Sequence, residues 1–167
     1  MKTIRTFIIA AIIGISCSSQ IKAQDYRTAI GLRLGETSGL TFKQALGGDH
    51  AFEAIVGFWP DAFSITALGE KYVPLAVPGL DLYYGVGLHV AFETTDRYYY
   101  LADRGRYYFT RYGGSTGIGI DGMLGVEFKV PVVPLAFSLE IKPFVEFNTN
   151  NNIYLALDPG LGIKLAF

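Results

Sequence analysis

The sequence predicts an all-β fold, an eight-stranded antiparallel up-and-down transmembrane β-barrel that follows a cleaved signal peptide. Apolar residues alternate with small or charged ones along residues 153–167, as on a strand with two different faces. Half of the 167 residues are hydrophobic and only 17% are charged, against about a quarter in a typical soluble domain. The same alternation recurs in stretches separated by turn residues, which indicates many paired strands.

The long apolar run at the start of the chain predicts a secretory signal peptide over residues 1–23. Lys2 and Arg5 precede the apolar stretch 7–15, and small polar residues lead to Ala23. A retained membrane anchor would need about 20 apolar residues. Cleavage would leave residues 24–167 as the barrel domain. It would remove three cations and no acid, changing the formal charge from −1 to −4. A mildly acidic product argues against a nucleic-acid partner.

Cys17 is the one cysteine of the chain, and it lies inside the predicted signal peptide. The mature chain would therefore have neither a disulfide nor a thiolate metal site. In a lipoprotein, Cys17 would instead be the lipidated first residue. Residues 14–16 lack the leucine that such proteins usually have three places before the cysteine, so cleavage after Ala23 is favoured. We predict no cofactor.

Glycine, proline and short polar turns divide the mature chain into eight predicted strands. The segment 73–79 contains Pro74 and Pro78, which cannot donate to a strand ladder, and is expected to be a rigid connection. The stretch 93–114 lacks clean alternation and is expected to be the main loop. Eight antiparallel strands can close into a barrel. The predicted strands are 26–35, 39–46, 50–59, 62–72, 80–92, 115–130, 135–148 and 153–167.

The composition of the less apolar face predicts which face of each strand is inside. A soluble lipocalin-like barrel would show the same alternation with its apolar face inward. In the strand 80–92, however, Leu82, Val86 and Leu88 alternate with Gly85 and Gly87. A face so rich in glycine and so poor in charge would not dissolve a protein, but it suits a narrow eight-stranded interior. The apolar face is therefore predicted to face lipid.

The charged residues of the other face would then share the barrel interior. We expect them to be paired, because an unpaired buried charge costs several kcal/mol. An interior filled in this way is not an open channel. The predicted members of this interior network are Arg33, Lys43, Glu53, Asp81, His89, Asp121, Glu127, Lys129, Glu140, Lys142, Glu146, Asp158 and Lys164.

The lengths of the connections agree with an outer-membrane topology. If the first strand starts on the periplasmic side, the segment 93–114 lies outside the cell, and the short turns at 47–49, 74–79 and 131–134 lie inside. An even number of strands returns Phe167 to the periplasmic face. An aromatic last residue after an alternating strand resembles the signal that the barrel-assembly machinery reads.

Three parts of the sequence carry a family resemblance: residues 29–35 with 38–43, residues 79–89, and residues 119–127. They resemble the small eight-stranded outer-membrane barrels of the OmpX and OmpA-domain kind, and particularly a group common in Bacteroidetes. The resemblance implies the fold, a place in the bacterial outer membrane, and lipid, lipopolysaccharide and the barrel-assembly machinery as partners. It implies no established activity.

The histidines give little support to catalysis. His89 is expected on the inner face amid Asp81 and Glu127, where it would act as a general base or metal ligand, or simply fill the interior; we favour the last. Some outer-membrane barrels are lipid A deacylases with a serine two residues after a histidine, and neither His50 nor His89 has one. We predict a non-enzymatic protein. A lipid A-modifying enzyme and a narrow pore are the alternatives.

The segment 93–114 is the predicted surface-binding loop of a monomer. Planar rings and guanidinium groups suit sugars, lipopolysaccharide phosphates or an extracellular protein. The alternative is that they form the aromatic girdle and meet anionic head groups. The candidate residues are Arg97, Tyr98, Tyr99, Tyr100, Arg104, Arg106, Tyr107, Tyr108, Arg111 and Tyr112.

Overall fold

The computed structural model describes residues 26–59, 62–93, 97–103, 106–112, 116–149 and 153–167, so the predicted signal peptide lies outside the described residues. No helix in these ranges is long and apolar enough to cross a membrane. The strands of the described ranges are β1 (Thr28–Gly35), β2 (Ser38–Gly47), β3 (His50–Trp59), β4 (Ala62–Pro74), β5 (Leu80–Glu93), β6 (Arg97–Asp103), β7 (Arg106–Tyr112), β8 (Thr116–Lys129), β9 (Leu135–Asn148) and β10 (Ile153–Ala166).

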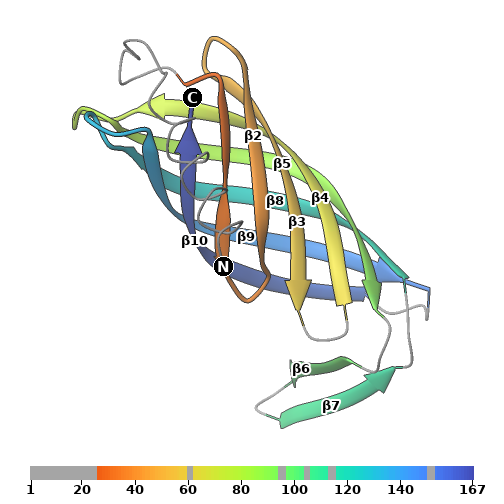
Figure 1. Cartoon of the computed structure of the whole chain (residues 1–167). Coiled ribbons are helices and arrows are strands. Elements are labelled where there is room, and N and C mark those ends of the chain that lie inside the picture. The colour runs from red at the N-terminus through yellow and green to blue at the C-terminus, as the bar shows by residue number, and fades with distance from the viewer. Residues whose placement is uncertain (1–25, 60–61, 94–96, 104–105, 113–115, 150–152) are drawn as a thin grey trace, which may run out of the picture.

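Eight of these strands form a closed barrel, which confirms the predicted fold class (Figure 1). The order around the barrel is β1, β10, β9, β8, β5, β4, β3 and β2, and every neighbouring pair is antiparallel. The chain end completes the closure. The Phe167 amide donates to the Thr28 carbonyl at 2.8 Å, and the Thr28 amide donates to the Phe167 carbonyl at 2.9 Å. Closure leaves the barrel without a free sheet edge.

Two predicted connections differ from the structure. β4 continues through Val73 to Pro74, which pairs with Asp81, so the connection is only 75–79. The predicted loop 93–114 contains the hairpin β6–β7, paired from Arg97 with Tyr112 to Asp103 with Arg106. Aromatic residues at successive positions hide the alternation of this hairpin in the sequence. Figure 1 shows it beyond the barrel end opposite the C-terminus.

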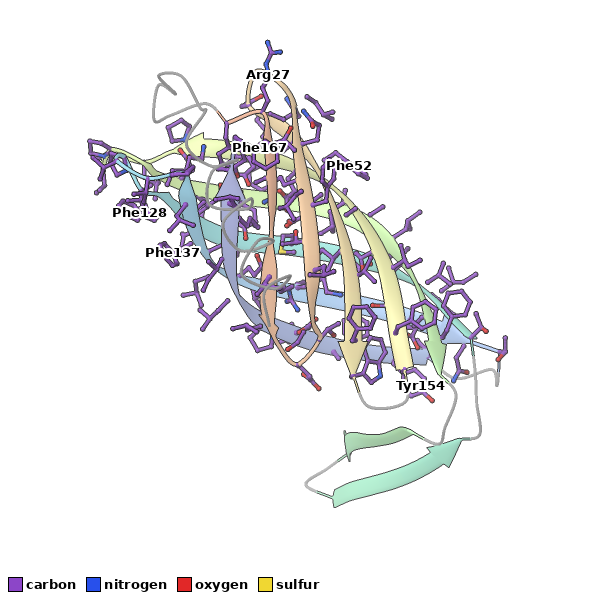
Figure 2. The ribbon with its side chains drawn as sticks, viewed as in Figure 1. Arg27, Phe52, Phe128, Phe137, Tyr154 and Phe167 are labelled. Carbon is purple, nitrogen blue, oxygen red and sulfur yellow. The ribbon has the colours of Figure 1, made fainter. Side chains whose placement is uncertain are left out.

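The outer surface of the barrel is apolar. Large hydrophobic side chains point outward from every barrel strand, and Val86 and Leu155 are 72% and 78% exposed. Phe52, Phe128 and Phe137 project away from the wall in Figure 2. Strand residues alternate between two faces, and an eight-stranded barrel is too narrow to hold these side chains together inside. The predicted direction of each face is therefore the observed one.

Glycines on the inner face make room for large polar side chains from neighbouring strands. A Cβ at Gly125 would lie 2.6 Å from the Tyr83 ring, and one at Gly160 would lie 2.7 Å from the Arg33 guanidinium. Both Tyr83 and Arg33 are almost completely buried. The glycines of the inner face therefore reflect the limited volume of the interior.

Candidate functional site

The barrel interior collects charged side chains from all eight strands. The thirteen predicted members of the interior network all lie on inward positions. Eleven of them are buried, while Asp81 and Lys129 are partly exposed at the end that carries the C-terminus. Glu70 of β4 belongs to the same network and is 3% exposed. The sequence prediction omitted it, although the alternation of residues 62–72 places it inward.

Lys43 is the centre of the first group, the Lys43 cluster, formed by Lys43, Glu53, Glu70, Glu127 and Lys164. Lys43 Nζ lies 2.8 Å from Glu70 Oε2, 3.2 Å from Glu53 Oε2 and 3.7 Å from Glu127 Oε2. Lys164 Nζ lies 3.3 Å from Glu53 Oε1 and 3.4 Å from Glu127 Oε2. β2 and β8 are on opposite sides of the barrel. The contact of Lys43 with Glu127 therefore crosses the lumen.

Tyrosines surround the Lys43 cluster and were not predicted as part of it. Lys43 Nζ donates to Tyr72 Oη at 2.6 Å and lies 4.4 Å from the centroid of the Tyr83 ring. Tyr26, just before β1, donates its hydroxyl to Glu127 Oε1 at 2.5 Å. Burial, followed by the charge of Glu127, raises the pKa of the Tyr26 phenol. Tyr26 thus keeps its proton and acts as a donor to the carboxylate.

Arg33 of β1 is the centre of a second group, the Arg33 cluster, formed with Glu140 and Asp158. Arg33 Nε donates to Glu140 Oε1 at 2.6 Å, and Nη1 lies 3.1 Å from Asp158 Oδ2. The guanidinium also donates to the Thr37 carbonyl at 2.6 Å and to the Asp158 carbonyl at 3.0 Å. Glu140 receives a further bond from Tyr83 at 2.5 Å. The guanidinium is therefore bonded on all three nitrogens, as a buried cation requires.

His89 of β5 lies between two carboxylates in a third group, the His89 cluster. Its Nδ1 is 2.8 Å from Asp121 Oδ2, and its Nε2 is 3.0 Å from Glu146 Oε2. Each ring nitrogen is therefore occupied by a carboxyl oxygen within hydrogen-bond distance. Lys142 Nζ approaches Asp121 Oδ1 at 3.3 Å. A ring held in this way has no free lone pair to remove a proton or bind a metal.

The partners of His89 differ from those expected. The sequence predicts His89 amid Asp81 and Glu127, but Asp81 pairs with Lys129 at 2.8 Å near the C-terminal end of the barrel, and Glu127 belongs to the Lys43 cluster. All three side chains lie on the inner face as predicted, but the alternation does not say how far each residue lies along the barrel axis. Among the described residues, no three His, Cys, Asp or Glu side chains are placed to hold a metal ion.

A small apolar group fills part of the lumen. Ile55, Leu68, Tyr83 and Met123, from four neighbouring strands, are each at most 3% exposed. Tyr72 packs against them, with its ring stacked on Tyr83 at 5.3 Å between centroids. Together with the ion pairs that cross the lumen, these side chains occupy the middle of the barrel.

The predicted surface-binding residues fall on the hairpin β6–β7, except Arg104, which lies outside the described residues. The strand register pairs Tyr98 with Arg111 and Arg97 with Tyr112. Each of these two backbone pairs thus joins a tyrosine position to an arginine position. What this hairpin binds stays a prediction.

Comparison with known proteins supports the fold. No protein-family model matches the sequence, and no curated protein is found as a relative. The crystal structure of the N-terminal β-barrel domain of Pseudomonas aeruginosa OprF is similar, with a TM-score of 0.50 and 12% identity over 84% of this chain and 95% of that one. At an identity this low, the structural similarity shows a shared β-barrel fold and nothing more. It does not bear on the Bacteroidetes grouping, which stays a prediction.

Proposed function

We propose that this protein is a monomeric, non-enzymatic barrel of the bacterial outer membrane, whose β6–β7 hairpin makes contacts at the cell surface. The observation that carries the proposal is the apolar outer surface of a closed barrel with a charged interior. Water cannot stabilise such an exterior, whereas hydrocarbon can, and closure satisfies the backbone groups that lipid would leave unpaired.

Aromatic residues at the two ends of the barrel support a position across a bilayer. Phe128 and Phe137 are exposed near the C-terminal end (Figure 2). Phe63 and Phe92 stack at 4.9 Å between centroids near the opposite end. Aromatic girdles of this kind flank the apolar band of outer-membrane barrels. In the proposed orientation the short turns and Phe167 face the periplasm, and the hairpin lies outside the cell.

Solubility tests the membrane proposal directly. Residues 24–167, purified without the predicted signal peptide, should fold in detergent micelles or vesicles and aggregate in buffer alone. Far-UV circular dichroism and sedimentation would measure both outcomes, and sedimentation in micelles would also measure the monomeric state. A folded, monodisperse chain in buffer without detergent would contradict the proposal.

Contact at the cell surface is proposed for the hairpin because it combines tyrosines with arginines. Tyrosine rings stack on sugars, and guanidinium groups bind phosphates in a bidentate manner. Lipopolysaccharide, an extracellular glycan and a protein are the candidate partners. Changing Tyr98, Tyr99 and Tyr100 together to alanine should reduce binding of intact cells to glycan arrays or host surfaces. Thr110→Ala on the partner strand is the control, and equal binding by both variants would count against this role.

The geometry of His89 supports a protein without enzymatic activity. Both ring nitrogens are held by carboxylates, which leaves no base for a nucleophile. Cells that express the protein should therefore contain unmodified lipid A by mass spectrometry. A modification that His89→Gln abolishes would favour the enzyme alternative.

The filled lumen supports a barrel that does not conduct. Lys43 and Glu127 meet across the lumen, and the buried apolar group lies in the same interior. The protein in planar bilayers should therefore show no steady ion conductance. Regular conductance steps that persist in the folded protein would favour the pore alternative.

A further inference from the structure

A cavity opens at the barrel end that carries the C-terminus. Its volume is about 330 Å³. One wall is the connection 75–79, folded back by bonds from the Leu75 amide to the Leu80 carbonyl and from the Leu80 amide to the Val77 carbonyl, both 3.0 Å. The turn after β2 forms the facing wall, and Lys43 lies on the floor. The cavity is separate from the hairpin, which lies at the other end of the barrel.

The cavity already holds one ammonium group, that of Lys129. Lys129 Nζ lies 5.1 Å from the centroid of the Tyr26 ring and 5.3 Å from that of the Tyr72 ring. Asp81 Oδ2 lies 2.8 Å from the same nitrogen. Two aromatic faces and one carboxylate are the groups by which proteins recognise organic cations. The side chains of Lys129 and Asp81 are 17% and 13% exposed, so an ammonium group from solvent can reach Asp81 and take the place of Lys129.

The charges beneath the cavity are balanced. The Lys43 cluster contains three carboxyl groups and two ammonium groups. Glu53 and Glu70 are hydrogen-bonded to each other, which requires a proton on one of these two carboxyl groups. The cluster therefore neither attracts nor repels a ligand by net charge, and the preference for a cation comes from Asp81 and the faces of Tyr26 and Tyr72.

The walls of the cavity are apolar and suit a ligand whose ammonium group is attached to an apolar group. Leu75, Val77 and Leu80 line the cavity together with Pro74 and Pro78. An apolar cavity of about 150 Å³ is enough to hold benzene. The volume here therefore accommodates a phenyl ring with a short aliphatic chain.

We propose that this cavity binds a small protonated amine with an apolar body, whose ammonium group replaces that of Lys129 between Tyr26, Tyr72 and Asp81. The displaced lysine side chain is long and moves toward solvent at the mouth of the cavity. Lys129 thus competes with the ligand, and Asp81 is the counter-ion of both.

Isothermal titration calorimetry of residues 24–167 in detergent micelles tests this proposal, with heats from protein-free micelles subtracted. The probe is 2-phenylethylamine, compared with the anion 3-phenylpropionate and the neutral 2-phenylethanol. The amine should give saturable binding, and the other two should bind at least about tenfold more weakly, since one lost ionic contact changes affinity by that order. Equal or tighter binding of the anion would overturn the proposal. So would the absence of saturable binding of the amine up to about 10 mM.

Two variants separate this site from adventitious binding. Lys129→Met removes the competing ammonium and should tighten amine binding about tenfold, whereas Asp81→Asn should weaken it about tenfold. Glu36→Gln is the matched carboxylate control, since Glu36 is exposed in the turn at the opposite end of the barrel, and it should leave binding unchanged. Weaker binding by the Lys129 variant, or no effect of the Asp81 variant, would overturn the proposal. The three probes on the unaltered chain provide a test that needs no variant.

Discussion

Replacing Arg33 by methionine tests whether the interior network stabilises the barrel. Arg33 is 1% exposed, and methionine fills much of its volume without its charge. The change leaves Glu140 with bonds from Tyr83 and Ser138 but no cation, and it leaves Asp158 with the Thr37 amide and with Lys142 at 3.6 Å. Removing one partner of a buried ion pair costs about 3–5 kcal/mol, because the other charge stays buried and unpaired. We expect Arg33→Met to lower the free energy of unfolding by about 4 kcal/mol.

Urea unfolding of the protein in lipid vesicles, followed by Trp59 fluorescence, measures this loss. Adding Glu140→Gln to the Arg33 variant should recover part of it, because one of the unpaired charges is removed. Lys71→Met is the control, since Lys71 is 44% exposed and its contact with Asp49 at 3.4 Å is worth less than about 1 kcal/mol. A loss below about 1 kcal/mol for Arg33→Met, equal to that of the control, would refute the reasoning.

Three further predictions concern the outer face, the inner face and the chain end. Val86→Arg places a charge near the middle of β5 on the outer face. In vesicles it should lower the free energy of unfolding, measured with urea, by about 2–4 kcal/mol. An unchanged free energy of unfolding would mean that this face does not meet lipid. Gly119→Ala places a methyl group against the His89 ring and should lower the free energy of unfolding by about 1–3 kcal/mol. Gly69→Ala is the control and should be nearly neutral, because the atom nearest to the added Cβ lies 3.9 Å away. Deleting Phe167 removes the backbone bonds with Thr28 and the proposed assembly signal, so less folded protein should reach the membrane fraction.

The hairpin β6–β7 shows where prediction from the sequence stopped. The segment has tyrosines at 98–100 and again at 107 and 108, so both faces of each strand carry large aromatic residues. A period of two cannot be detected when adjacent positions are alike. The pairing of Arg97 with Tyr112 comes from the structure.

The position of His89 illustrates a different limit. Its inward direction follows from the alternation in β5, and its burial follows from that direction. Its partners depend on the stagger between strands, which the period of two does not contain. The register pairs His89 with Gly119 on β8, and this brings Asp121 and Glu146 to its ring in place of Asp81 and Glu127.

Local alternation and composition are enough to predict the eight barrel strands, the side chains of each strand that point inward, and the apolar outer face. They do not predict which charges meet across the lumen, that Glu70 and the tyrosines belong to the network, or that a cavity lies at one end. These features depend on strand stagger and barrel closure, which bring together residues as far apart as Arg33 and Asp158, and no local pattern records such distances.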